Sequence, residues 1–275
     1  MSHPGFPEAS RALAAGMLAL SARDRVLGGI FRDAGRYVAA MCAFYLYADG
    51  GGLTLPRLKA ICARSGLLSP GRARNLLQLL EHLRYVEPGA RGRGGKATTY
   101  HPTSTFLAAW EEQLRTAVEA ARRIEPAIAV VLDRLDQPHV LRTFARFHAE
   151  GLVTATGDGT FVRPFVQTFM HPYAGTQIVW VLIDLAKGEE FPPRSTGPIT
   201  LSGLARQFGV SRVHIKRIFD DGEREGLSRL ESDGEVNLTP AAVAQLSIIY
   251  GVQFAQLLSA AARTAVILAS HAVAA

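Results

Sequence analysis

The chain has 275 residues, enough for two domains of ordinary size and a substantial buried core. Apolar residues make up 48% and charged residues 20%, proportions that exclude a largely disordered chain and one embedded mostly in a membrane. The net charge of +6 and a pI near 9.6 favour an anionic partner, with nucleic acid ahead of a membrane surface.

The N-terminal residues MSHPGFPEAS carry no basic segment ahead of the apolar run Leu13–Leu20, so we expect no signal peptide and a cytoplasmic protein. Cys42 and Cys62 lie in apolar, helix-like patterns. A buried free thiol is the usual state of such cysteines, and the sequence gives a redox-sensing role no support.

The first half of the chain predicts a definite order of elements. An apolar helix covers 38–49, a short strand and a helix meet at Thr54-Leu55, and a second helix begins at Ser69 with Pro70 well placed in its first turn. The segment LRYVEPGARGRGGKATTYHPT (83–103) predicts a hairpin, and Thr103 is an expected N-cap of a long helix.

Residues 125–165 fit this order less well. The stretch LVTATGDGTFVRP (152–164) alternates in polarity around a Gly-Asp-Gly turn, which predicts an extra hairpin. A degenerate third wing is less favoured, because no clear helix-turn-helix precedes it.

The second half repeats the order of the first. SPGRARNLL (69–77) aligns with SRVHIKRIF (211–219) without a gap, at a shift of 142 positions, and apolar positions match apolar ones. We expect Thr200 to begin a helix, Gly209 to end it in the left-handed conformation, and Ser211 to cap the next helix. LSRLESDGEVNLTP (227–240) predicts a second hairpin, and Thr239 is an expected cap of the last helix.

Both second helices expose polar side chains. Ile215, Ile218 and Phe219 share one face at helical spacing and are expected to be buried. The opposite face suits the major groove, where arginine pairs with guanine and asparagine or glutamine with adenine. The candidate DNA-contacting residues of these helices are Arg72, Arg74, Asn75 and Gln78 in the first half and Arg212, His214, Lys216 and Arg217 in the second; Val213 is also expected to be exposed at the start of the second helix.

The two predicted hairpins differ in charge. The first carries Arg91, Arg93 and Lys96 among glycines, a basic tip suited to phosphates or the minor groove. The second, ESDGEV, is short and acidic, so we expect the two halves to grip DNA unequally.

The C-terminal residues 241–275 form the most apolar segment. Gln245, Gln253, Gln256 and Arg263 interrupt it, and its alanines and serines are poor lipid-facing side chains. We therefore expect a buried helix at a domain or subunit interface and no membrane partner.

The element order resembles that of winged helix-turn-helix regulators of the MarR-like type, duplicated in one chain. The resemblance covers most of both halves in order but is sharp over about twenty residues in each. It implies a mainly α fold with small β wings, in which two winged helix-turn-helix domains are joined by a helical dimerisation-like layer. The expected divisions are 1–124, 125–165 and 166–275. GVSRVHIKRIF also resembles the AraC-type motif, which we rank second because that family pairs its motifs more closely and without wings.

The MarR-like resemblance further implies double-stranded DNA as partner and a small acidic or aromatic effector between the helical layer and a DNA-binding domain. The two-fold partner of the family would be internal, a pseudo-dimer, with a further homodimer left open. Two departures stand out: the first turn, ARSGLLS, is longer than the second, FGVS, and the second wing lacks a basic tip.

Other chemistry has little support. The sequence holds no HExxH, CxxC, P-loop or G-x-S-x-G motif, so we expect no enzyme activity, no metal and no cofactor. The main alternative is a tandem winged-helix interaction module of the chromosome-partitioning type, which predicts acidic or apolar faces where this sequence has basic ones. A replication initiator is a weaker DNA-binding alternative.

Overall fold

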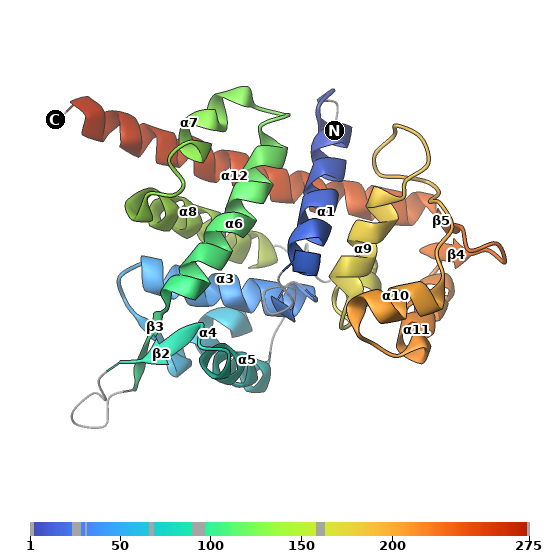
Figure 1. Ribbon diagram of the computed structural model, residues 1–275, viewed down its shortest axis with the longest axis horizontal. Helices are drawn as coiled ribbons and strands as arrows, with labels where there is room; N and C mark the ends of the chain where they lie inside the picture. Colours follow the sequence, from blue (N-terminus) through green and yellow to red (C-terminus); the bar gives the residue numbers. More distant parts are fainter. Residues whose placement is uncertain are drawn as a thin grey trace. The chain divides into compact units, whose positions relative to one another are not determined.

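The computed structural model describes residues 3–23, 29–30, 32–65, 69–89, 97–157 and 163–273 (Figure 1). The fold is mainly helical with small antiparallel sheets, as the sequence predicts. The chain divides into two compact units, each built from separate stretches: unit 1 is Met1–Ala34 with Phe161–Val252, and unit 2 is Gly35–Thr160 with Gln253–Ala275.

Unit 2 contains the first copy of the predicted order. Helix α3 (Ala34–Ala48) precedes β1 (Leu53–Thr54), α4 (Leu55–Ser65), α5 (Pro70–His82), β2 (Val86–Pro88), β3 (Thr99–Pro102) and α6 (Ser104–Ala121). The strands pair antiparallel in the order β1-β3-β2, with Leu53 opposite Tyr100 and Glu87 opposite His101. Phe44, Phe106 and Trp110 form an aromatic core, because α3 and α6 both bury their apolar faces there.

Unit 1 contains the second copy. It comprises α1 (Phe6–Arg23), a π-helical turn (Val166–Met170), α9 (Gly175–Asp184), α10 (Leu201–Phe208), α11 (Arg212–Arg224) and the hairpin β4 (Ser228–Leu230) and β5 (Val236–Leu238). Ser195 also pairs with Asn237 of β5 through a single antiparallel bridge. This bridge lies beside β5 as β1 lies beside β3 in unit 2. Helix α1 packs against α9.

These units divide the chain differently from the expected 1–124, 125–165 and 166–275. The sequence assigned the N-terminal helix to the first half, whereas the structure groups residues 1–34 with the second copy. The apolar stripe of α1, which includes Leu13, Met17 and Leu20, is buried in unit 1. An apolar stripe predicts that a helix is covered but not which helix covers it.

The prediction of a hairpin at 152–164 is wrong for the residues of this stretch that the structure describes. After a 3₁₀ turn (Pro126–Ile128) and α7 (Ala129–Leu132), helix α8 runs from Pro138 to Gly157. Phe144, His148 and Leu152 are buried at four-residue spacing, so the helical period of the preceding turns continues through the threonine-rich end. Residues 158–162 lie outside the described part.

The last helix, α12 (Pro240–Val273), starts in unit 1 and continues in unit 2. Among the described helices it is the one that is long and apolar enough to cross a membrane by length and composition, and 33% of its most apolar stretch is buried. Leu246 and Tyr250 are buried in unit 1, and Phe254 and Leu257 in unit 2.

The helix starts of the two copies use matched hydrogen bonds. In each copy a threonine hydroxyl accepts a backbone N–H at the start of the first helix and a serine hydroxyl does the same at the second, as the sequence predicts. The bonds are Arg57 N to Thr54 Oγ1 (3.4 Å), Gly203 N to Thr200 Oγ1 (3.1 Å), Arg72 N to Ser69 Oγ (3.3 Å) and His214 N to Ser211 Oγ (3.1 Å). Gly209 ends α10 with φ of 63°, which confirms its left-handed conformation.

The connections to the hairpins also match. Arg84 and Gly226, 142 positions apart, both have positive φ, 57° and 64°. The next residues donate backbone bonds of 2.8 Å back to the helix, Tyr85 to Leu80 and Leu227 to Gly222. Thr103 and Thr239 then cap α6 and α12, as predicted. The repeat in the sequence is therefore also a repeat of backbone hydrogen bonds.

The copies differ in how one core position is filled. Leu80 in α5 is fully buried, and the matched residue of α11 is Gly222. A Cβ at Gly222 would lie 2.6 Å from Phe169 Cζ and 2.6 Å from Ser228 Oγ. The ring of Phe169, from the π-helical turn, thus occupies the space in unit 1 that a side chain on α11 would need.

Cys42 and Cys62 are both buried thiols and form no disulfide, as the sequence predicts. A hydrogen bond between the two thiols raises the pKa of Cys42 and lowers the pKa of Cys62. This contact joins α3 to α4 within unit 2.

Candidate nucleic-acid interface

Helix α5 carries the first recognition face, which we define as Arg72, Arg74, Asn75 and Gln78. All four side chains are exposed, whereas Ala73, Leu76 and Leu77 are buried against the rest of unit 2. Alternation of buried and exposed positions at helical spacing turns every candidate contact of α5 outward.

Helix α11 carries the second recognition face, which we define as Arg212, Val213, Lys216 and Arg217. These four are exposed, and Ile215, Ile218 and Phe219 are buried, as the sequence predicts. The ammonium group of Lys216 lies 2.7 Å from both carboxylate oxygens of Asp220, one turn further along the helix. This pair neutralises part of the positive charge of the second face.

His214 differs from its neighbours on α11. Its ring is half-buried, with Nε2 2.7 Å from the carbonyl oxygen of Tyr173, while Nδ1 lies 3.2 Å from Nη2 of Arg217. These partners select the tautomer with hydrogen on Nε2, which donates to Tyr173, and leave Nδ1 to accept from Arg217. The ring that the sequence placed among the DNA contacts is therefore directed toward Tyr173.

The two hairpins are described unequally. Arg91, Arg93 and Lys96, the basic tip expected in the first hairpin, lie outside the described residues. In the second hairpin Glu235 forms an ion pair with Lys187, and Asp233 Oδ1 accepts a bond from Glu235 N at 3.0 Å. Its acidic side chains thus have local partners.

Charge is divided unevenly between the units. Unit 2 contains 17 lysines and arginines and 11 acidic residues, a net charge of +6, whereas unit 1 contains 13 of each. The whole net charge of the chain therefore lies in unit 2, the unit with the first recognition face. Attraction to a polyanion is expected to act mainly on that unit.

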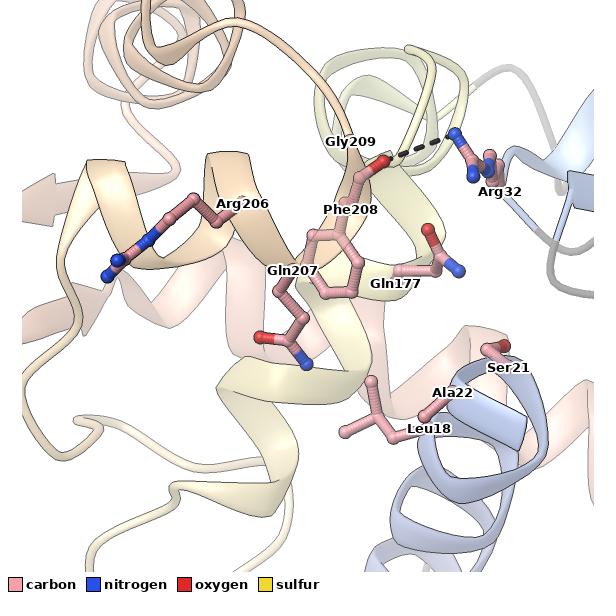
Figure 2. A pocket seen from close by; sticks show the side chains of 9 residues that line it. All are labelled: Leu18, Ser21, Ala22, Arg32, Gln177, Arg206, Gln207, Phe208 and Gly209. Atoms are coloured by element: carbon pink, nitrogen blue, oxygen red, sulfur yellow. Dashed lines mark hydrogen bonds between the residues drawn. The ribbon is translucent and has the colours of Figure 1, made fainter. Parts of the chain in front are cut away.

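A cavity of about 270 Å³ lies within unit 1, between α1, α9 and the end of α10 (Figure 2). Ser21 comes from α1, Gln177 from α9 and Gln207 from α10, and Arg32 approaches from the segment after α1. Figure 2 shows Arg206 pointing away from Arg32, whose guanidinium is directed toward the backbone oxygen of Phe208. Nε of Arg32 and Oγ of Ser21 are buried and have no hydrogen-bond partner within the described part of the chain.

Arg32 also joins the cavity to the second helix pair. Its Nη1 donates to the carbonyl oxygen of Phe208, the last residue of α10, at 3.1 Å (Figure 2), and to the hydroxyl of Tyr173. The guanidinium lies over the Tyr173 ring, 4.9 Å from its centre. Because the Tyr173 carbonyl contacts His214, a chain of polar contacts runs from the cavity to the start of α11.

This network could not be predicted from the sequence. Arg32, Tyr173 and Phe208 are separated by 141 and 35 positions, and no motif unites them. Within the described ranges, no group of three or more histidine, cysteine or acidic side chains is arranged to hold a metal ion.

A scan against protein-family models, a search of curated proteins and a search of solved structures each returned no match for this chain.

Proposed function

We propose that the chain is a cytoplasmic, sequence-specific regulator of transcription that binds double-stranded DNA through two unequal winged helix-turn-helix domains. In this assignment α4–α5 and α10–α11 are the helix pairs, and the hairpins β2–β3 and β4–β5 are the wings. Helices α5 and α11 are the recognition helices, because each follows the turn of its pair. The pseudo-dimer is internal to the chain.

The observation that carries the proposal is the pair of matched, outward recognition faces. In each copy a serine-capped helix buries its apolar side chains and exposes a cation at one matched position, Arg74 in α5 and Lys216 in α11. A solvated helix face needs no such correspondence between copies. Long cationic side chains in the first turns of a helix are suited to guanine edges and to phosphates.

Binding of the full chain to duplex DNA as a function of salt tests this function. With random duplex we expect micromolar binding at 50 mM salt that weakens steeply by 200 mM, because bound cations release counterions from the DNA. A selected site should bind at least 10³-fold more tightly. Failure to bind random duplex at low salt would favour the tandem interaction module.

The selected site should also be asymmetric. Two identical recognition helices favour a palindrome, but α5 and α11 expose different side chains. We expect two unlike half-sites about one helical turn apart, ~34 Å. A palindromic selected site would contradict the assignment of two non-identical recognition helices.

The effector that the family resemblance implies is placed, in this proposal, in the cavity beside α10. Arg32 supplies a cation, and Ser21 and Gln177 supply polar groups, so a small carboxylate is the ligand class that fits. Benzoate at millimolar concentration is expected to raise the melting temperature of the chain, and Arg32→Gln should abolish the shift. Arg206→Gln is the matched control, and benzoate should raise its melting temperature as much as that of the unchanged chain.

A further inference from the structure

Val213 is the most exposed large apolar side chain in the described part of the chain, at 77%. It is the second residue of α11, in the turn that begins at the Ser211 cap. Leaving a valine this exposed brings no folding benefit, since burial of its methyl groups is what stabilises a fold. Single exposed apolar side chains are common on protein surfaces, so it is the place of Val213 among the exposed cations of the second recognition face that points to a contact outside the chain.

The direction of Val213 follows from the helix. Val213 precedes the fully buried Ile215 by two residues, which is about 200° around the helix axis. It therefore lies near the centre of the outward side of α11. Arg212, Lys216 and Arg217 are exposed on the same side, so the apolar group is surrounded by cations.

This setting favours nucleic acid over an apolar protein surface. A protein contact that buried Val213 would have to desolvate the neighbouring cations as well, which is costly without acidic partners. The major groove instead presents phosphates and acceptor atoms for the cations, together with one apolar group, the 5-methyl of thymine.

We propose that Val213 contacts the 5-methyl group of one thymine in the half-site read by α11, so that this residue sets a base preference; the inference rests on the proposed DNA-binding function. The matched residue of α5 is Gly71, which is exposed and has no side chain to make this contact. The methyl preference is thus confined to one half-site. It supplies a physical reason for asymmetry beyond the difference in charge.

The test uses the full chain and its selected duplex, with each thymine replaced in turn by deoxyuridine, which lacks only the 5-methyl group. At one thymine position the unchanged chain should lose about three- to fivefold in affinity, the effect of one buried methyl. Val213→Ala should bind the intact duplex three- to fivefold more weakly and show no further loss at that position. Val213→Thr keeps one methyl group, so its affinity should still fall when that thymine is replaced by deoxyuridine.

The outcomes are distinct. Absence of binding to any duplex overturns the proposed function itself. Normal binding with the same deoxyuridine profile in the unchanged chain and in Val213→Ala overturns the role of Val213 alone, as does a selected site without thymine in either half. Val130→Ala, which removes an exposed valine from unit 2, is the matched control and should leave the profile unchanged.

Discussion

Replacing Arg72 and Arg74 together by alanine is expected to weaken the binding of random duplex about 100-fold at 50 mM salt, roughly tenfold for each lost cation. Both side chains are exposed on the first recognition face, in the unit that holds the whole net charge of the chain. The slope of log K against log salt should fall by about 2, one for each lost phosphate contact. Titration of labelled duplex at four salt concentrations measures both quantities.

A control variant that lacks two other arginines of unit 2 distinguishes the loss of contacts on the first recognition face from the loss of net charge. Arg134 and Arg142 are also exposed and lie in unit 2, so their replacement by alanine changes the charge of that unit by the same amount. We expect the control to lose less than threefold, since removing charge away from the face alters only the long-range attraction. Equal losses in the two double variants would show that α5 is not the contact surface.

A fall in pH from 6.5 to 4 is expected to lower the free energy of unfolding of unit 2 by about 3 kcal/mol, because His148 is buried as a neutral ring. The ring is buried on α8, stacked at 6.1 Å on Phe144, and Nδ1 has no hydrogen-bond partner in the described part of the chain. Burial lowers the pKa of His148 from 6.5 to about 4, because the charged ring would lose its hydration. The neutral ring is thus the form that the folded unit accommodates.

The sign of the effect follows from proton binding. Between pH 6.5 and pH 4 the unfolded chain binds a proton at His148 that the folded chain does not, so stability falls as the pH falls and changes no further below about pH 4. Urea unfolding of the unchanged chain and of His148→Leu at pH 7, 5.5 and 4 isolates this contribution. The variant should lose less stability than the unchanged chain, and parallel pH profiles would refute the assignment.

The sequence predicts the two helix pairs well because their signals are local. Thr200 specifies where α10 begins, Gly209 where it ends and Ser211 where α11 begins, through hydrogen bonds and a left-handed residue within a few positions. The split between buried Ile215 and exposed Lys216 follows from helical period alone. Both kinds of signal can be found without knowing what packs nearby.

Other features depend on distant partners and could not be predicted. The threonine-rich end of α8 favours a strand locally, but the helix continues because earlier turns set a buried stripe through Phe144 and His148. The direction of the His214 ring depends on Tyr173, which precedes a left-handed Ala174 and follows a π-helical turn. Neither conformation has a sequence signal of its own.

At one matched core position unit 2 has the side chain of Leu80, whereas unit 1 has Gly222 with the ring of Phe169 against it. This difference has a consequence for the evolution of the chain. If recombination between the two gene halves exchanged α5 for α11, the incoming leucine would collide with Phe169 in unit 1, and the incoming glycine would leave a hole in unit 2. Gene conversion, which keeps young duplicates alike, would therefore be selected against at this position. Once the phenylalanine had taken over the space, the two copies were free to diverge in the side chains that α5 and α11 expose.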